Sequence, residues 1–376
     1  MTRAWGFIVD RYLLVPIAAV LALIWANTYA ESYFRLADAL AFPVNEIGMA
    51  LGLAYLAQEI VEAALPGGSL YPFNRAVVPL IGGLGGMIGA SLVYAGYLAL
   101  GDEQILARGW PVAGAADLVI TLTVARAIFG RGAAATMALV FALTSDVIGL
   151  IAISGQHLVA RAHAAAVLLI VAGIALAAVF RHRRVVSSWP YIACAGTLSW
   201  LGCYWSGLQP VLALLPIVPF LRHTPRDLTQ PHDQSSRHRG ATHFESVFQA
   251  PVLVIVFLFG LLNAGMAVRG ADSGAWAVLV ASLVGRPVGT LVAIGIATLA
   301  GLHLPRGTGW RDALVSALAA APTLVFGVLF AVAVFPVGPL LEQTKLGAIA
   351  TAIGLVPAFV AARLLRVGRF ATVTHR

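Results

Sequence analysis

Long apolar runs recur along this chain from one end to the other, and many reach about 18 residues. A helix of that length crosses the hydrocarbon layer of a membrane, which is about 30 Å thick. The composition agrees, because 60% of the 376 residues are hydrophobic, 11% are charged and the mean hydropathy is +0.89. A soluble domain carries roughly a quarter charged residues. The alternating pattern of barrel strands is absent, so the sequence predicts an all-α membrane protein.

About twelve transmembrane helices are predicted with a hydropathy window of about 19 residues. The seventh and eighth are short and are separated only by Ser206-Gly207. A polar segment, 222–246, separates the eighth from the ninth and is predicted to be a cytoplasmic loop. The chain, 1–376, is therefore expected to form a single polytopic domain. The predicted helices lie near residues 12–29, 46–65, 76–100, 111–129, 132–153, 162–180, 190–206, 208–221, 248–268, 275–301, 312–335 and 345–366.

Basic residues gather on one side of these predicted helices, which indicates the orientation of the chain. With both termini in the cytoplasm, most arginines fall in inner segments, and the outer segments hold only Arg35, Arg108, Arg161, Arg269 and Lys345. The positive-inside rule therefore predicts cytoplasmic termini in a bacterial inner membrane. The formal net charge of +8 does not indicate nucleic-acid binding, because the arginines lie between apolar segments rather than along one face.

Carboxylates within the predicted helices are informative, because a charge at the bilayer centre is costly unless it is paired or hydrated. Glu46, Glu59 and Glu62 follow one another along the second predicted helix, and Glu46 and Glu62 are most simply interpreted as interfacial. Asp146 differs, since apolar stretches flank it at 137–143 and 147–153. A carboxylate in such surroundings binds a proton and a cation in competition, which is the chemistry of a cation/proton exchanger.

Arg286 is the one arginine expected deep within a predicted helix, in the segment Gly285-Arg-Pro-Val-Gly289. Arginine stays protonated even when buried, so its guanidinium must meet a carboxylate or the carbonyl groups at the end of a helix. A purely structural ion pair with Asp117 or Asp146 is an alternative to a functional role.

Two predicted helices are interrupted at similar depth. In the fourth, Pro111 and a run of small residues precede Asp117, and in the eleventh Ala-Ala-Ala-Pro322-Thr323 falls within the helix. Broken helices in corresponding places of two halves point to a transport site, because their ends expose unpaired backbone groups. Asp117 is expected to neutralise two positive N-terminal ends and Arg286 two negative C-terminal ends. The alternative is that Pro322 only kinks its helix.

Other chemistries have little support. There is no phosphate-binding glycine loop, no metal-ligand spacing and no histidine deep in a predicted helix to act as a general base. The two cysteines, Cys194 and Cys203, lie in one apolar stretch and are interpreted as packing residues. The sequence therefore predicts neither an enzyme nor a bound cofactor.

The order and spacing of several short motifs, over residues 12–366, resemble the NhaA-type sodium/proton antiporters. Each motif is modest alone, and together they are specific. They are Asn45-Glu-Ile-Gly-Met-Ala50 with Gln58-Glu59, Arg108-Gly-Trp-Pro-Val-Ala-Gly-Ala-Ala-Asp117, Ala138 to Ser145-Asp146-Val-Ile-Gly149, Asn263-Ala-Gly265, Gly285-Arg-Pro-Val-Gly289, His303-Leu-Pro-Arg-Gly307 and Lys345-Leu-Gly347.

The resemblance implies a transporter with a twelve-helix fold and two inverted three-helix repeats, helices 3–5 and 10–12. Their broken helices, 4 and 11, would cross at mid-membrane. It also implies exchange of cytoplasmic sodium or lithium for external protons, usually by a homodimer. Carried over by position, Asp146, Ser145 and Asp117 form the cation and proton site, with Asp146 as the Na⁺ ligand. Asp117 also balances charge together with Arg286. Glu59 is a carboxylate of the cytoplasmic funnel, and Pro322 and Thr323 mark the second break.

The chain also departs from the family pattern. The family has paired aspartates in helix 5, where this chain has Ser145 and Asp146, and a lysine where it has Arg286. The threonine before the helix-4 aspartate is Ala116, and the glycine-rich break of helix 11 is the alanine run before Pro322. A histidine linked to the pH response is replaced by Gln209, and histidines before helix 9 are replaced in the stretch 245–249. The segment before the second helix is too short for the β-hairpin that joins the family's dimer.

These departures suggest altered ion coupling. One carboxylate, Asp146, would carry the proton beside a fixed arginine, Arg286, and Ser145 would supply a neutral oxygen ligand. The sequence therefore predicts electroneutral one-for-one exchange. Two alternatives stay open: the same fold with another cargo, such as an anion or organic solute attracted by Arg286, or a non-transporting paralogue that serves as a regulator or scaffold.

Overall fold

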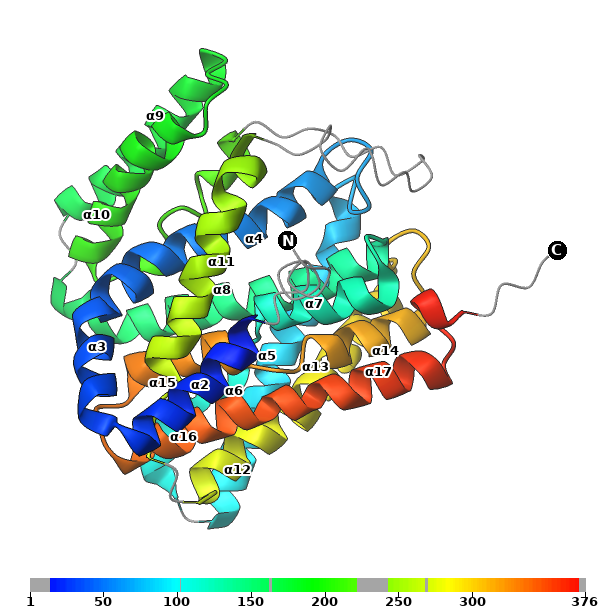
Figure 1. The fold of residues 1–376 in the computed structure, drawn as a ribbon. Coiled ribbons are helices and arrows are strands. Elements are labelled where there is room, and N and C mark those ends of the chain that lie inside the picture. Colours follow the sequence, from blue (N-terminus) through cyan, green and yellow to red (C-terminus); the bar gives the residue numbers. More distant parts are fainter. Residues whose placement is uncertain (1–13, 102, 162–163, 222–242, 268–269, 372–376) are drawn as a thin grey trace, which may run out of the picture.

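A computed structural model describes residues 14–101, 103–161, 164–221, 243–267 and 270–371, and every regular element within these ranges is helical (Figure 1). The prediction of an all-helical fold is thus confirmed for this part of the chain. The α-helices are α2 (Leu14–Thr28), α3 (Ala30–Phe42), α4 (Met49–Ala64), α5 (Asn74–Gly101), α6 (Trp110–Gly114), α7 (Leu118–Phe129), α8 (Ala133–Arg161), α9 (Ala164–His182), α10 (Thr197–Ser206), α11 (His243–Asn263), α12 (Ser273–Val280), α13 (Arg286–Leu299), α14 (Trp310–Ala319), α15 (Leu324–Val334), α16 (Pro339–Ala350) and α17 (Leu355–Leu364).

Seven helical segments of the described chain are long and apolar enough to cross a membrane, or up to nine if each of two bent helix pairs counts as one. Membrane-spanning helices are therefore confirmed, whereas the predicted number of twelve is not. Two shorter helices account for part of the difference, since α2 has 15 residues within the described range, which begins at residue 14, and α10 has 10. The seven segments are Ala30–Ala64, Asn74–Gly101, Ala133–Gly155, Ala164–His182, Ser246–Asn263, Ser273–Leu299 and Pro339–Phe370.

Residues 30–45, expected to be a connection, instead form helix. The helix α3 continues through a π-helical turn, Pro43–Gly48, into α4, so that Ala30–Ala64 is one segment of 35 residues. The charged residues of α3 hid this helix from the hydropathy window, but Glu31, Arg35 and Asp38 all lie on its exposed face. Glu31 and Arg35 also pair across one helical turn at 3.3 Å, which favours helix at this position.

The predicted eighth helix, 208–221, is wrong. This segment contains two short 3₁₀ turns, Pro210–Leu212 and Val218–Phe220, joined by further turns. The physical reason is its proline content, since Pro210, Pro216 and Pro219 each remove a backbone donor and block a continuous α-helix. Of the predicted cytoplasmic loop, 222–246, residues 222–242 lie outside the described residues. The last four residues, 243–246, belong to the start of α11.

Both predicted helix breaks are present. The segment Gln104–Gly114, which includes α6, meets α7 at a bend of 44°, and α14 meets α15 at a bend of 50°. The first break covers residues 115–117 and the second residues 320–323. Each bent pair passes the length and apolarity test for a membrane helix only when its halves are taken together. The interpretation of Pro322 as a simple kink is therefore wrong, because the helix stops before it and restarts after it.

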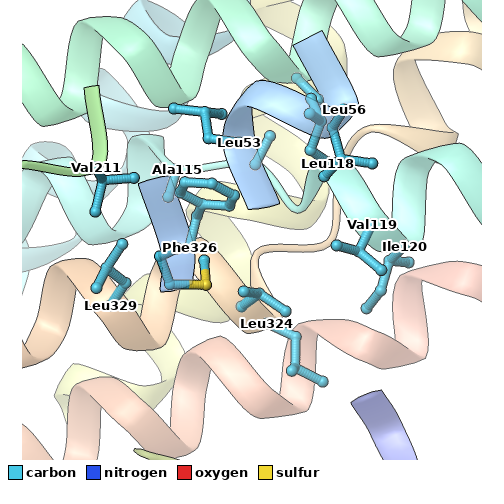
Figure 2. Packing of buried hydrophobic residues seen from close by; sticks show 14 of the residues in the cluster. Leu53, Leu56, Ala115, Leu118, Val119, Ile120, Val211, Leu324, Phe326 and Leu329 are labelled. Carbon is cyan, nitrogen blue, oxygen red and sulfur yellow. The ribbon is translucent and has the colours of Figure 1, made fainter. Parts of the chain in front are cut away.

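The two breaks lie in the main apolar core, to which α4 also contributes. Leu53 and Leu56 of α4 belong to the same packed cluster as Ala115 and Leu118 at the first break and Leu324 after the second (Figure 2). Polar backbone groups in such surroundings need partners from the protein itself, since water is absent from an apolar core. This requirement determines the polar contacts of the site.

Glycines allow α5 and α13 to pack at very short distance. A Cβ atom at Gly89 of α5 would lie 2.5 Å from the carbonyl oxygen of Gly285 and 2.6 Å from the Cα of Gly289. At Gly289 of α13, a Cβ would lie 2.3 Å from the carbonyl oxygen of Gly85. Small residues at such positions let helix backbones approach closely within a membrane. Because α13 begins with Arg286, this contact also helps to place that side chain.

Gly89→Leu should destabilise the protein by about 3 kcal/mol or more, because its side chain would collide with backbone atoms that cannot turn aside. Thermal unfolding of the detergent-purified protein measures the change. Gly96→Leu is the matched control on the same helix, since a Cβ at Gly96 meets nothing within 4 Å. Equal unfolding temperatures for the two variants would contradict the proposed packing role of Gly89.

Candidate functional site

Asp117 caps the N-terminus of α7. Its Oδ1 atom accepts hydrogen bonds from the backbone N–H groups of Val119 and Ile120, both at 3.0 Å. Aspartate suits this position because its carboxylate satisfies N–H groups that have no partner within the helix and opposes the positive end of the helix dipole. The side chain is fully buried, so these bonds replace its contacts with water.

The same carboxylate reaches the second break. The Oδ2 atom of Asp117 accepts a hydrogen bond of 2.8 Å from the N–H of Val325, in the first turn of α15. One buried carboxylate thus contacts the N-terminal ends of two half-helices that lie about 200 residues apart in sequence. The two breaks consequently lie against each other, although they belong to different parts of the chain.

Arg286 bonds to the C-terminal end of α6. Its Nη2 atom donates to the carbonyl oxygen of Ala113 at 3.2 Å and makes a very short contact with that of Ala115. The Oγ atom of Ser282, one helical turn earlier, also donates to the Ala113 carbonyl, at 3.3 Å. The last carbonyl groups of a helix have no N–H partner within the helix and form the negative end of its dipole. The positive guanidinium of Arg286 opposes that negative end.

Only one of the two expected C-terminal ends receives Arg286. No hydrogen bond from Arg286 to α14 is found within the described residues; instead the Ala319 carbonyl oxygen of α14 accepts a hydrogen bond from the Thr121 hydroxyl at 3.4 Å. Arg286 also forms no direct ion pair with Asp117 or Asp146 in the part of the chain that the structure describes. The alternative of a structural ion pair at Arg286 is therefore not supported.

Asp146, on α8, is fully buried and incompletely bonded. Its Oδ1 atom accepts a hydrogen bond of 2.7 Å from the N–H of Ala116, in the break between α6 and α7. No donor among the described residues reaches its Oδ2 atom. A buried carboxylate oxygen without a donor is where a proton or a bound cation would satisfy the group. The geometry therefore joins Asp146 to the residue next to Asp117 and leaves one oxygen for such a ligand.

Ser145 is buried beside Asp146 in sequence, but its hydroxyl serves the packing of α8. It donates to the carbonyl oxygen of Phe141 at 3.1 Å or of Gly83, on α5, at 3.0 Å. A hydroxyl has one proton to donate, so these two carbonyls share or compete for it. The observed rotamer therefore uses Ser145 to join α8 to α5, and ligation of a cation would require its remaining lone pairs.

The second break contains Pro322 and Thr323, both buried. The backbone N–H of Thr323 donates to the hydroxyl of Thr351 at 2.8 Å. This bond and the bond from Val325 to Asp117 together hold the first residues of α15.

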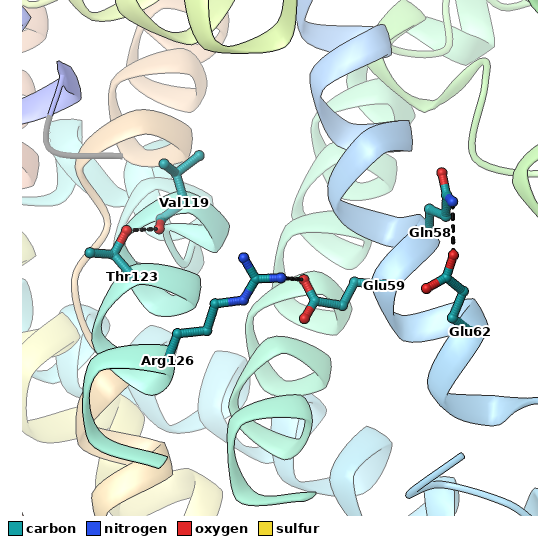
Figure 3. A network of polar contacts seen from close by, with 6 residues as sticks. All are labelled: Gln58, Glu59, Glu62, Val119, Thr123 and Arg126. Carbon is teal, nitrogen blue, oxygen red and sulfur yellow. Dashed lines mark hydrogen bonds and ion pairs between the residues drawn. The ribbon is translucent and has the colours of Figure 1, made fainter. Parts of the chain in front are cut away.

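The carboxylates of α4 lie further from the breaks. Glu59 forms an ion pair with Arg126 of α7, with 2.7 Å between Oε2 and Nη2, and Gln58 donates to Oε1 of Glu62 at 2.9 Å (Figure 3). The Glu59 and Arg126 side chains are 17% and 26% exposed, so the ion pair is partly buried. Arg126 lies nine residues after Asp117, about 13 Å along an α-helix.

Four residues of the site had not been predicted. Thr121, Ser282 and Thr351 are neutral hydroxyl residues within helices, where most such side chains bond their own helix, and nothing in the sequence distinguishes them. Arg126 had been assigned only to the inner side of the membrane. Its place on the same helix as Asp117, two and a half turns away, is the one signal that would have suggested a role near the site.

Residues 11–365 match the sequence profile of the family described as Na⁺/H⁺ antiporter 1. The chain belongs to the Na⁺/H⁺ antiporter 1 family. Its relatives include the Na⁺/H⁺ antiporter NhaA of Desulfitobacterium hafniense, which is 35% identical over 371 residues, covering 96% of this chain and 95% of the relative. The Na⁺/H⁺ antiporter NhaA of Geobacter metallireducens is 36% identical over 374 residues, covering 96% and 97%. That of Geobacter sulfurreducens is 32% identical over 376 residues, covering 96% and 97%.

Membership of the Na⁺/H⁺ antiporter 1 family confirms the resemblance found in the sequence. It applies to nearly the whole chain, so both helix breaks and the residues around them lie within the matched region. The family does not by itself assign roles to Asp146, Asp117 or Arg286 in this chain, and their roles are argued from the geometry above.

Proposed function

We propose that this protein exchanges sodium or lithium ions for protons across the bacterial inner membrane, with both termini in the cytoplasm. The observation that carries the proposal is the fully buried carboxylate of Asp146, bonded through Oδ1 to the break of one helix and left without a donor at Oδ2. Family membership supports the choice of cargo. A buried oxygen that binds either H⁺ or Na⁺, but not both at once, couples the two movements.

Asp117 and Arg286 act as fixed charges in this proposal. Asp117 has three backbone donors on its two oxygens, so both oxygens are already bonded to the protein. Arg286 stays protonated and bonds to carbonyl groups rather than to Asp146. In this proposal, the charge that changes during transport is that of Asp146. Ser145 contributes a neutral oxygen ligand through a lone pair of its hydroxyl that is directed toward the cation.

One variable carboxylate implies one-for-one exchange. When Asp146 carries either one proton or one sodium ion, no net charge crosses the membrane in a full cycle. The contacts of Arg286 support this, since an arginine fixed to carbonyl groups cannot act as a second proton carrier. The alternative cargo, an anion or organic solute, would bind at the guanidinium of Arg286, whose Nη2 is engaged with Ala113 and Ala115 and whose Nε has no hydrogen-bond partner among the described residues.

Reconstitution into liposomes tests the proposal. A pH-sensitive dye trapped inside should report acidification when sodium-loaded liposomes are diluted into choline medium, because sodium leaves and H⁺ enters. It should report alkalinisation when sodium is added outside sodium-free liposomes, because sodium enters and H⁺ leaves. Clamping the membrane potential with potassium and valinomycin should leave the rate unchanged. Absence of a response to both sodium and lithium would reject the exchange, and a rate that follows the membrane potential would reject one-for-one coupling.

Glu59 is proposed to attract cations on the cytoplasmic approach to the site. Glu59→Gln should raise the sodium concentration for half-maximal exchange by about threefold to tenfold, because it removes one negative charge near the cation path. The maximal rate should stay near that of wild type. Sodium titration of dye-loaded liposomes measures both values. Glu31→Gln is the matched control, because Glu31 forms an exposed ion pair with Arg35 within α3. An unchanged half-maximal concentration for Glu59→Gln would remove Glu59 from the cation path.

A further inference from the structure

Thr351 lies where the last apolar segment is interrupted. It is the first residue of a 3₁₀ turn, Thr351–Gly354, between α16 and α17, and its side chain is fully buried. None of the sequence motifs includes it. Its contacts nevertheless lead directly to the second helix break, on a different part of the chain.

The hydroxyl of Thr351 is an acceptor for that break. It donates its one proton to the carbonyl oxygen of Ala348, at 2.5 Å, within its own helix. It can therefore only accept from its other two neighbours, which are the backbone N–H of Thr323 at 2.8 Å and the Thr323 hydroxyl at 3.3 Å. Both donors belong to Thr323, the residue before α15. A single hydroxyl thus completes the bonding of a buried break that would otherwise leave a backbone N–H without a partner.

The start of α15 is therefore held from two sides. Thr351 accepts from the N–H of Thr323, and two residues later Asp117 accepts from the N–H of Val325. Residues two apart in a chain cannot move independently, so loss of one bond shifts the donor of the other. The position of Val325 against Asp117 consequently depends on Thr351. Asp117 in turn adjoins Ala116, whose N–H donates to Asp146.

We propose that Thr351 is a positioning residue of the cation site: its hydroxyl holds Thr323 so that the N-terminal end of α15 meets Asp117. This inference rests on the proposed cation exchange. Thr351 never contacts the ion in this account; it acts through Thr323, Val325 and Asp117. A neutral hydroxyl suits the task, because a second carboxylate at this end of α15 would add a charge that the site does not need.

Thr351→Val tests the inference, because valine keeps the shape of threonine and removes the acceptor. We expect it to raise the half-maximal sodium concentration about tenfold, the cost of leaving one buried donor unpaired, with a maximal rate near that of wild type. Thr351→Ser should restore wild-type behaviour, since it keeps the hydroxyl. Thr344→Val is the matched control in the same segment, because the buried Thr344 hydroxyl bonds, within the described part of the chain, only to Leu340 and Leu341 of its own helix.

Amide hydrogen exchange gives a second readout that does not depend on transport. In Thr351→Val, amides of residues 323–326 should exchange about tenfold faster than in wild type, and in Thr344→Val they should not change. Wild-type values for Thr351→Val in either measurement, or an equal effect of Thr344→Val, would overturn the inference. If wild type exchanges cations and Thr351→Val matches it, only the inference about Thr351 fails. If wild type exchanges no cation, the proposed function fails, and the proposed role of Thr351 in exchange fails with it.

Discussion

Asp146→Asn should abolish sodium-evoked proton movement in liposomes, lowering the rate by at least about a hundredfold. The asparagine amide keeps the size of the side chain and its acceptor for the Ala116 N–H. It binds no proton near neutral pH, and it offers no charge to a cation. Since Asp146 is the only carboxylate of the site with an oxygen that no donor reaches among the described residues, no other group can replace it.

The control for this variant is Asp272→Asn. Asp272 is exposed, and one of its oxygens accepts from Gln343 at 3.0 Å, so its loss should leave transport unchanged. Both variants are compared with wild type at equal protein content, after thermal unfolding has established that they are folded. Retention of more than about a tenth of the wild-type rate by Asp146→Asn would mean that another group carries the proton.

Asp117→Ala should unfold the protein at a much lower temperature than wild type, with a loss of stability on the order of 5 kcal/mol. The variant leaves the N–H groups of Val119, Ile120 and Val325 without their acceptor in an apolar core. Each such orphaned donor costs about 1–3 kcal/mol. It also removes the negative charge that opposes the N-terminal ends of α7 and α15.

Fluorescence-monitored thermal unfolding in detergent measures this effect, with Asp38→Ala as control, since Asp38 lies on the exposed face of α3. Asp117→Asn should fall between wild type and Asp117→Ala, because the amide keeps one acceptor oxygen and loses the charge. An Asp117→Ala variant as stable as Asp38→Ala would show that other groups satisfy the two half-helices.

The helix breaks could be predicted because their signals are strong. Pro322 lies within the second break, whereas Pro111 lies in the first turn of α6, four residues before the first break at 115–117. Asp117 was interpretable for the same reason, since a charge so deep in an apolar segment must have backbone donors around it. The carboxylate contacts with both α7 and α15 agree with that reasoning.

The contacts of Arg286 and Ser145 could not be predicted, because they depend on packing rather than on local sequence. Arg286 was expected at two C-terminal ends and bonds to one, that of α6, while a threonine of α7 serves the other. Ser145 was expected at the ion, and its hydroxyl instead joins α8 to α5 at Gly83. The rotamer of a buried side chain follows from its neighbours in space, and these were not known from the sequence.

Hydropathy also failed where charge and proline mislead it. The charged residues of α3 made a helix resemble a connection, and the apolar stretch at 208–221 resembled a helix although three prolines divide it. Thr351 was not identified at all, because a single threonine in an apolar helix has no distinctive signal. The unpredicted residues of the site are thus the neutral ones, whose importance depends on long-range contacts.

The account depends on one carboxylate that binds either a proton or a cation. Counting the protons released when sodium binds to the detergent-purified protein tests this directly, with a pH-sensitive dye in weak buffer and sodium binding followed in parallel. The account predicts release of about one proton per sodium ion by wild type, at a pH where Asp146 is protonated, and none by Asp146→Asn. Release of about two protons per sodium, or an unchanged release from Asp146→Asn, would contradict it.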